Sequence, residues 1–278
     1  MCLPADESTL VLFVTYKTIA LGHTVSSTRN ALSTIRRQHL ASGFIMPTPA
    51  ECFALQEALR GAQRFLSKPT VQKLPMFPSL VSALVASTQW GSPMRCLYLT
   101  LWFTFARLAS LIPTVTPYSP GSHLSWGNIT FYRDAVKIVL SKTKTIQCKE
   151  RSLQFVIPEH SNKSVCLFTQ LKAWFSASPH THSTDPVFLI VHCGVYQPFN
   201  RQLADPVLKS AIAALGLDPT KFGWSSFRRG GATTGFLATG DVEALREHGD
   251  WRSNAYTRYL ALPASKRTHI VNALQGLF

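Results

Sequence analysis

The chain has 278 residues, with 28 Lys and Arg against 14 Asp and Glu and a formal net charge of +14. A hydrophobic fraction of 46% is enough to build a buried core, which excludes a chain that is disordered by composition. The positive charge favours a polyanionic partner, nucleic acid first, although a basic protein without such a partner would show the same balance.

Several classes of protein are excluded by what the sequence lacks. The longest apolar run, Leu97–Phe105, is far shorter than the roughly 20 residues that a membrane-spanning helix needs. The segment Met1–Glu7 has neither the basic region nor the apolar core of a signal peptide. The 6 cysteines are scattered without a CxxC pair, which argues against structural zinc and a disulfide framework. We therefore expect an intracellular protein with no membrane, no metal and no cofactor.

The N-terminal part of the chain is predicted to be helical from residue 8 to residue 66. Ser8 or Thr9 would cap a first helix that runs to about Ala20. A second helix is expected over 29–43, preceded by capping serines and threonines, and Thr48–Pro49 would open a third, with Pro49 at its first position.

A proline-rich segment without periodicity follows and is predicted to be a linker over 67–79. It divides the chain into a small helical module, residues 1–72, and a larger second domain, residues 73–278.

The second domain is predicted to be mainly α with a small antiparallel β-sheet. Helices are expected at 80–88 and 93–112, and β-rich runs at 129–132 and 135–140 flank a turn at Arg133–Asp134. The remaining expected elements are a strand at 152–157, helices at 167–176 and 203–215, and short helices after 225.

Positive charge is concentrated in parts of the chain that carry few acidic residues. No acidic residue lies between Glu57 and Asp134, as a surface facing phosphates would require, since each carboxylate would repel the ligand. A chance gap is the alternative, because acids are few everywhere. The predicted DNA-binding residues are Arg29, Arg36, Arg37, Arg60, Arg64, Lys142 and Arg229.

Two cationic positions stand out by their surroundings. Arg107 lies in an apolar segment, and burying its guanidinium would cost several kcal/mol without an anionic partner. An exposed stripe or an internal carboxylate is the alternative explanation. Lys144 follows the apolar run that ends at Leu140, where a lysine can reach a ligand from a fixed backbone, although charged hairpin tips are usually only solvated.

Two further segments suggest a site that binds an anion. Ser225 and Ser226 would cap a helix whose first turn carries Arg228 and Arg229, a place that favours cations only if a phosphate is bound there too. Gly230 and the glycine after it would let another backbone come close.

The last of these segments is a turn near the C-terminus. Gly249 is expected to end a helix and Ser253 to cap the next, which places Tyr256 and Tyr259 near one face. Tyrosines in such places are most often packing residues.

Together these segments resemble the catalytic domain of tyrosine recombinases (the phage-integrase family), and most closely the version carried by DIRS- and Ngaro-type retroelements of eukaryotes. The residues that carry the resemblance are Phe105–Ser110, Ser141–Gln147, Ser226–Thr233 and Gly249–Leu260. The resemblance implies a helical, SAM-like core-binding module ahead of a DNA breaking-rejoining domain. The opening helix of that module is missing or shortened here, which would make the chain a fragment.

The resemblance assigns a role to each matched residue. Arg107 and Arg228 would grip the scissile phosphate, Lys144 would protonate the leaving oxygen, and Tyr259 would be the nucleophile. The implied function is a site-specific recombinase or integrase that cuts and rejoins double-stranded DNA through a 3′-phosphotyrosine, with dimers or tetramers on the DNA. Its place would be the nucleus in a eukaryotic host.

Two departures from the family pattern affect the chemistry. Ser225 stands where the family has a histidine, and Asp250 occupies the second His/Trp position, with Trp251 beside it. Loss of a general acid–base group typically costs about 10²- to 10⁴-fold in rate. A catalytically impaired relic that binds DNA without cleaving it is therefore the alternative. A type IB topoisomerase, a metal-dependent transposase and a plain DNA-binding protein also stay open.

Overall fold

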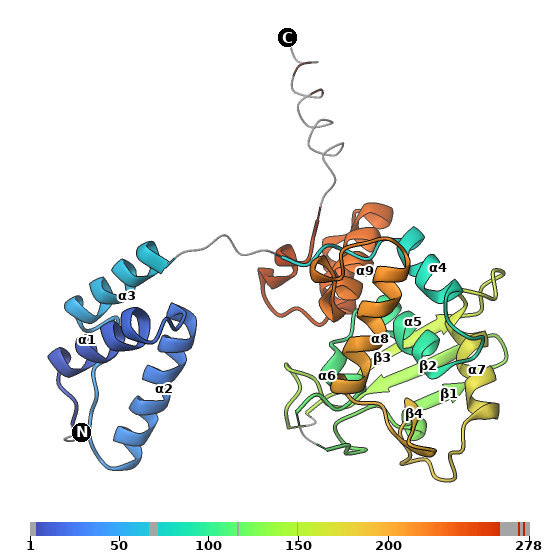
Figure 1. The fold of residues 1–278 in the computed structure, drawn as a ribbon, viewed down its shortest axis with the longest axis horizontal. Helices are drawn as coiled ribbons and strands as arrows, with labels where there is room; N and C mark the ends of the chain where they lie inside the picture. Colours follow the sequence, from blue (N-terminus) through green and yellow to red (C-terminus); the bar gives the residue numbers. More distant parts are fainter. Residues whose placement is uncertain are drawn as a thin grey trace. The chain divides into compact units, whose positions relative to one another are not determined.

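The computed structural model describes residues 4–66, 72–115, 117–148 and 150–261, together with the isolated positions 272 and 275. Within these residues the chain divides into two compact units, residues 1–71 and 72–278. Figure 1 shows both units. Among the described residues, no helix is long and apolar enough to cross a membrane.

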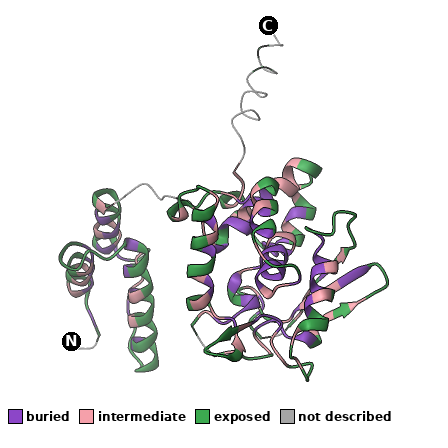
Figure 2. Ribbon diagram, turned by 45° about the vertical axis from the view of Figure 1, so that its right-hand side comes forward, coloured by how far each residue is buried: buried purple, intermediate pink, exposed green. Residues whose placement is uncertain are grey.

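The smaller unit is built from helices packed around one apolar core. Its elements are α1 (Glu7–Thr15), the π-helical turn η1 (Tyr16–Ala20), α2 (Val25–Ala41) and α3 (Phe53–Leu66). The buried residues of α3, Leu55, Leu59 and Ala62, follow helical spacing, so one stripe of the helix faces the core. In Figure 2 the buried residues of this unit line the sides of its helices that face one another.

The predicted starts of two of these helices were wrong. The second helix begins at Val25, because Thr24 caps it by accepting a hydrogen bond from the backbone N–H of Ser27 at 3.2 Å. The third begins at Phe53 and does not include Pro49. Glu51 instead closes a separate turn, accepting the backbone N–H of Thr48 at 2.7 Å, so the chain is not yet helical there.

The larger unit is mostly helical, with a three-stranded and a two-stranded sheet. Its helices are α4 (Pro78–Ala86), α5 (Pro93–Thr104), α6 (Leu108–Leu111), α7 (Leu167–Ala177), α8 (Arg201–Ala214), α9 (Trp224–Thr239) and α10 (Val242–His248). Short 3-10 turns are η2 (Trp126–Asn128), η3 (Pro219–Lys221) and η4 (Asn254–Arg258). The strands are β1 (Ile129–Phe131), β2 (Ala135–Leu140), β3 (Leu153–Pro158), β4 (Leu189–His192) and β5 (Val195–Pro198).

The three-stranded sheet has the order β1-β2-β3 and is antiparallel throughout, with Ile138 of β2 opposite both Ile129 and Phe155. The predicted strands and the turn at Arg133–Asp134 are confirmed. Helix α7 lies alongside this sheet in Figure 1. The connection from β2 to β3 carries Lys144 at one end of the sheet.

Helix α5 is the centre of the larger core and contacts α4, α7 and α9. Nearly every residue of α5 is buried, and the ring of Tyr98 stacks on Phe227 of α9 with a centroid distance of 5.3 Å. The close fit of α5 against α9 fixes the place of every functional side chain that α9 carries.

Three predictions for this unit were wrong or incomplete. The helix expected over 93–112 is interrupted after Thr104, and the hairpin β4–β5, which turns at Cys193 and Gly194, was missed. The linker predicted over 67–79 extends too far. Its first residues, 67–71, lie outside the described part of the chain. The later ones pack on α9, where the N–H of Met76 donates to the carbonyl of Ser226 at 2.9 Å.

Candidate functional site

Arg107 is presented by a break between two helices. Phe105, the residue after α5, has the left-handed φ of 49°, which ends the helix and turns the chain before α6. Its ring packs against His248 at a centroid distance of 4.6 Å, and such packing holds an uncommon conformation in place. Arg107 is thus the N-cap of α6 rather than an interior helical residue, and it is half-buried.

Arg228 lies on α9 and is 4% exposed. Its guanidinium donates to the carbonyl of Phe105 and, from Nη2, to the carbonyl of Gly249 at 2.6 Å. Asp250, which follows Gly249, has a left-handed φ of 54°. Two tight bends of the chain therefore supply the carbonyls that hold Arg228, while its buried Nε has no hydrogen-bond partner among the described residues.

Glycines allow α9 to approach its neighbours closely enough for this. A Cβ at Gly230 would come within 1.8 Å of the carbonyl oxygen of Met76, and one at Gly231 within 2.5 Å of that of Trp102. The predicted close approach at this pair is confirmed.

Two aromatic rings enclose the guanidinium of Arg228. Its central carbon lies 4.3 Å from the ring centroid of Trp251 and 4.9 Å from that of Tyr259. The centroids of the two rings are 5.4 Å apart. Trp251 is buried, and Tyr259 is partly buried. The ring faces stabilise the cation. The ring of Tyr259 and the cation of Arg228, which are 31 residues apart along the chain (259 − 228), thus meet in one place.

The electrostatics of the site favour an anion. Burial, followed by the nearby charge of Arg107, lowers the pKa of Arg228 to about 10, and the opposite influence of Tyr259 and Asp250 does not cancel the shift. Among the described residues no carboxylate forms a salt bridge with Arg107 or Arg228. An anion placed against both guanidinium groups would relieve their repulsion.

A small pocket lies against both Arg107 and Arg228. It is lined in part by Arg107, Ser110, Thr143, Arg228 and Asp250. Ser110 is buried there.

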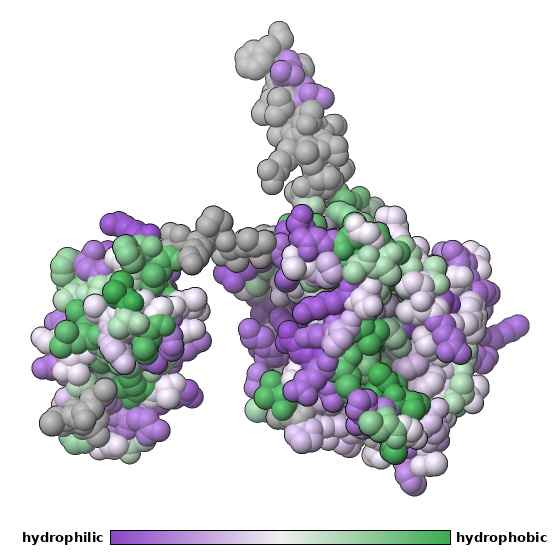
Figure 3. All heavy atoms as spheres, viewed as in Figure 1, coloured by the Kyte–Doolittle hydropathy of each residue, from purple (hydrophilic) through white to green (hydrophobic). Residues whose placement is uncertain are grey.

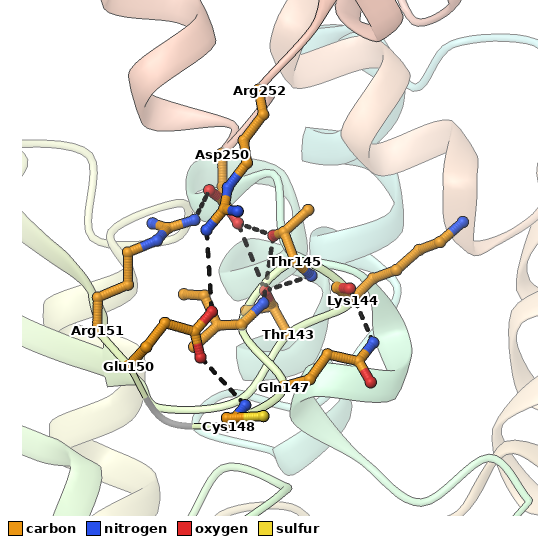
Figure 4. A network of polar contacts seen from close by, with 10 residues as sticks. Thr143, Lys144, Thr145, Gln147, Cys148, Glu150, Arg151, Asp250 and Arg252 are labelled. Carbon is orange, nitrogen blue, oxygen red and sulfur yellow. Dashed lines mark hydrogen bonds and ion pairs between the residues drawn. The ribbon is translucent and has the colours of Figure 1, made fainter.

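Lys144 lies on the β2–β3 connection, and its side chain is exposed. The neighbouring Thr143 and Thr145 contact the carboxylate of Asp250, as Figure 4 shows. The ammonium of Lys144 extends away from Asp250 in that view. The structure thus brings the loop that carries Lys144 to the turn that carries Asp250.

Ser225 and His248 have different surroundings. Ser225 is exposed in the first turn of α9 and does not cap it; the helix begins at Trp224, and Ser226 accepts the N–H of Gly223 at 3.1 Å from inside the first turn. The predicted capping by Ser225 was therefore wrong. His248 lies 2.7 Å from the carbonyl of Phe103 through Nε2, which must be the protonated nitrogen.

The predicted DNA-binding residues fall in both units. Arg29, Arg36 and Arg37 are exposed on α2, and Arg60 and Arg64 are exposed on α3. Arg60 also forms an ion pair with Glu57 at 2.6 Å.

In the larger unit, Lys142 is exposed and donates to Ser122 at 3.2 Å. Arg229 binds within the protein, donating to the side chain of Gln72 and to the carbonyl of Arg258 at 3.3 Å. Their roles toward DNA stay predictions.

Sequence reasoning missed several residues that build the site. Thr143, Thr145 and Arg151 all bind Asp250, and Phe105 supplies both the helix break and a carbonyl for Arg228. No local signal marks these contacts, since Asp250 is 99 residues from Arg151 along the chain. Within the part of the chain that the structure describes, no group of three or more His, Cys, Asp or Glu could hold a metal ion.

No protein-family model matches the chain, and no curated protein matches it either. Solved structures do. XerH site-specific recombinase bound to a palindromic difH substrate, in a post-cleavage complex, matches with a TM-score of 0.60 and 14% identity over 98% of this chain and 70% of that chain.

Two other DNA complexes are comparably similar. Tn1549 transposon integrase with circular intermediate DNA gives a TM-score of 0.58 and 13% identity over 96% of this chain and 85% of its own. A lambda integrase dimer bound to a core site gives a TM-score of 0.58 and 15% identity over 93% of this chain and 80% of its own. The fold is therefore that of the tyrosine recombinases, and the predicted fold class is confirmed.

Proposed function

We propose that this protein is a site-specific DNA recombinase or integrase that cuts and rejoins double-stranded DNA through a 3′-phosphotyrosine. The observation that carries the proposal is that Arg228 contacts the ring of Tyr259 and shares a pocket with Arg107, with no carboxylate in a salt bridge to either arginine among the described residues. The three structural neighbours, which are DNA-bound recombinases and integrases, support it.

The chemistry follows from the placement of these groups. The phenol oxygen of Tyr259 attacks the phosphorus of a phosphodiester, the P–O5′ bond breaks, and the phenol proton passes to solvent. Arg107 and Arg228 bind the non-bridging oxygens and stabilise the additional negative charge of the transition state. Lys144 donates a proton to the leaving 5′ oxygen, and reversal of these steps rejoins the strand.

The sequence-independent part of DNA binding falls to exposed cations of both units. Arg29, Arg36 and Arg37 lie on one helix of the smaller unit, which we take as a core-binding module that contacts the DNA backbone. In Figure 3 hydrophilic residues gather on the left of the larger unit, beside a hydrophobic patch, so its viewed face is not uniformly polar.

Self-association on DNA belongs to the same proposal. An apolar groove in the larger unit is lined by residues of the α5 end, α9 and α10, among them Trp102, Phe103, Gly235, Ala238 and Leu245. A second protomer packing there would bury this surface. Resemblance to the recombinases also implies that residues 264–278 pack on a neighbouring protomer, and these residues lie almost wholly outside the described part of the chain.

The finer parts of the proposal rest on the sequence. Asp250 in place of the second His/Trp supports an origin in DIRS- or Ngaro-type retroelements, and a DNA substrate implies an intracellular protein, nuclear in a eukaryotic host.

The alternative function, a relic that binds DNA without cutting it, is favoured by one observation. Ser225 supplies no proton-handling group where the family has a histidine. His248, which could otherwise replace that group, is hydrogen-bonded to the carbonyl of Phe103. The expected loss is about 10²- to 10⁴-fold in rate, which leaves slow cleavage rather than none.

A suicide substrate, nicked so that the cleaved strand is lost, tests the function directly. The unaltered chain should form a covalent adduct that is resistant to denaturant, and Tyr259→Phe should form none. Tyr256→Phe is the matched control, since Tyr256 is partly buried in the same short helix and should leave the adduct intact. An adduct that persists in Tyr259→Phe would contradict the proposed nucleophile. If the unaltered chain forms no adduct, the alternative function, DNA binding without cleavage, would stand instead.

A further inference from the structure

Asp250 is a carboxylate, 8% exposed, whose side-chain partners all lie on one distant segment. Thr143 donates to Oδ2 at 3.4 Å, Thr145 donates to the same oxygen, and Arg151 binds Oδ1. All three partners belong to the connection between β2 and β3. The carboxylate therefore fastens that connection to the turn before Tyr259.

The two threonines flank Lys144 directly. The hydroxyl of Thr143 also accepts the backbone N–H groups of Thr145 and Ile146, each at 3.2 Å, so the turn around Lys144 is closed on itself. Asp250 docks this closed turn as a unit. Because no hydrogen bond or ion pair of the described residues engages the ammonium of Lys144, a fixed backbone presents a side chain that is free to reach a ligand (Figure 4).

A second ion pair joins the same two segments. Arg252 lies 3.8 Å from Glu150, whose carboxylate also accepts the N–H of Cys148 at 3.1 Å. The turn that carries Asp250 and Arg252 also supplies the carbonyl of Gly249 to Arg228. One turn thus connects the loop of Lys144 with the arginine that we assign to the phosphate.

The charge of Asp250 argues for contacts within the protein rather than with the phosphate. Burial alone would raise its pKa, but hydrogen bonds from Thr145 and Arg151 outweigh burial, so the pKa lies below its ordinary value. An ionised carboxylate repels a phosphodiester, and here Arg151 neutralises it in a contact that leaves the carboxylate 7% exposed.

We propose that Asp250 is a positioning residue that docks the β2–β3 connection on the turn 249–252 and thereby places Lys144 against the leaving 5′ oxygen. This inference rests on the proposed function, because it takes protonation by Lys144 as the step that Asp250 serves. In this role Asp250 acts through the loop that carries Lys144, because Thr143, Thr145 and Arg151 of that loop bind its carboxylate.

Substrates with two different leaving groups test the inference. Sulfur in place of the bridging 5′ oxygen leaves as a thiolate and needs no proton, so it bypasses Lys144. With the oxygen substrate, Asp250→Ala should slow cleavage at least 10-fold but by no more than Lys144→Ala, for which loss of a general acid predicts about 10²- to 10⁴-fold. With the sulfur substrate, both variants should cleave within about 3-fold of the unaltered chain, which also shows that they are folded.

The double variant and a conservative variant sharpen the result. Asp250→Ala combined with Lys144→Ala should be no slower than Lys144→Ala alone, because both act on one step. Asp250→Asn keeps an acceptor for the threonines but loses the ion pair with Arg151, so its defect should be smaller than that of Asp250→Ala. An Asp250→Ala defect that is equally large on the sulfur substrate, or that adds to that of Lys144→Ala, would overturn the inference.

Hydrogen exchange without DNA separates the inference from the proposed function. Asp250→Ala should speed amide exchange of Thr145 and Ile146, whereas Glu159→Ala, which removes an exposed ion pair with Lys163 next to the same sheet, should not. No adduct from the unaltered chain on either substrate would overturn the proposed function and the role of Lys144 with it. Cleavage by the unaltered chain together with unchanged exchange in Asp250→Ala would overturn the inference alone.

Discussion

Arg228 organises the site because the fold surrounds a buried cation with carbonyls and aromatic rings. The carbonyls of Phe105 and Gly249 and the rings of Trp251 and Tyr259 occupy its surroundings, yet its Nε has no partner among the described residues. Burial of a cation without a carboxylate partner costs free energy. Binding of a phosphate would recover that cost.

His248 gives the site a predicted pH dependence in folding. His248 is exposed as a residue, but its imidazole contacts the rings of Phe105 and Phe155. The water that these rings displace lowers its pKa, helped by the charge of Arg228 and opposed by the hydrogen bond to Phe103. The unfolded chain therefore binds the proton at a higher pH than the folded chain does. The stability from neutral His248 is intact above the ordinary pKa of about 6.5 and is lost as the pH falls from there toward the folded value.

Thermal unfolding at pH 8 and at pH 5.5 measures this effect. The melting temperature should fall less between the two values in His248→Asn, which keeps an N–H for Phe103 but does not titrate. The reading at pH 8, where the imidazole is neutral in both states, gives the cost of altered packing alone. His123, whose pKa burial also lowers, leaves a remaining dependence of the same sign in the variant. An equal fall in both proteins would contradict the role of His248.

The residues of the site differ in how far the sequence predicts them. Arg107, Lys144, Arg228 and Tyr259 lie in local motifs that can be read one at a time. The structure places Arg228 against the ring of Tyr259 and in one pocket with Arg107. The contacts of Asp250 could not be predicted, because they join segments 99 to 107 residues apart and depend on how the β2–β3 connection folds back.

At the scale of elements, the placement of α9 depends on Gly230, which packs directly against the backbone of Met76. The segment before α4 crosses α9 so closely that Met76 binds Ser226 through its N–H, and Trp102 donates to the carbonyl of Met76 at 3.0 Å. Gly230 lies beneath this crossing.

Substitution of two glycines of α9 separates close packing from helix propensity. Gly230→Ala would place a Cβ 1.8 Å from the Met76 carbonyl, and overpacking of this kind typically costs about 1–3 kcal/mol or more. Gly235→Ala meets only ordinary contacts at 3.5 Å and should be neutral or stabilise by about 0.5–1 kcal/mol, because alanine favours a helix interior. Urea unfolding measures both, and a Gly230→Ala chain as stable as Gly235→Ala would contradict the packing described.

Elements with a clear repeat were predicted, and elements set by tertiary contacts were not. The sheet strands follow from β-branched runs around a turn, and their register is set by antiparallel pairing. The break at Phe105 is invisible in an apolar run that reads as continuous helix, because a distant ring contact stabilises it. The hairpin β4–β5 did carry a signal, a short turn containing Gly194, which could have been used.

At the scale of the whole molecule, a net charge of +14 predicts binding that depends steeply on salt. A protein that makes 6–10 phosphate contacts loses about 10³- to 10⁵-fold in affinity between 50 and 200 mM salt. Fluorescence anisotropy with duplex DNA should show a loss in this range.

Replacing Arg29, Arg36 and Arg37 with Gln should reduce the slope of log affinity against log salt by roughly 0.9 for each phosphate contact removed. Lys163→Gln is the control, because the ammonium of Lys163 is paired with Glu159 at 2.6 Å and should not contribute. Affinity that is independent of salt would contradict DNA as the partner of this charge.

The site of covalent attachment tests the central claim, that Arg107, Arg228 and Tyr259 act on one phosphodiester, most directly. After trapping on the suicide substrate, the complex is digested with nuclease and protease, and the modified peptide is sequenced by mass spectrometry. The result we predict is a nucleotide joined through its 3′ phosphate to Tyr259. A nucleotide on Tyr256, a 5′-linked nucleotide on any residue, or the absence of any nucleotide-bearing peptide would contradict the claim.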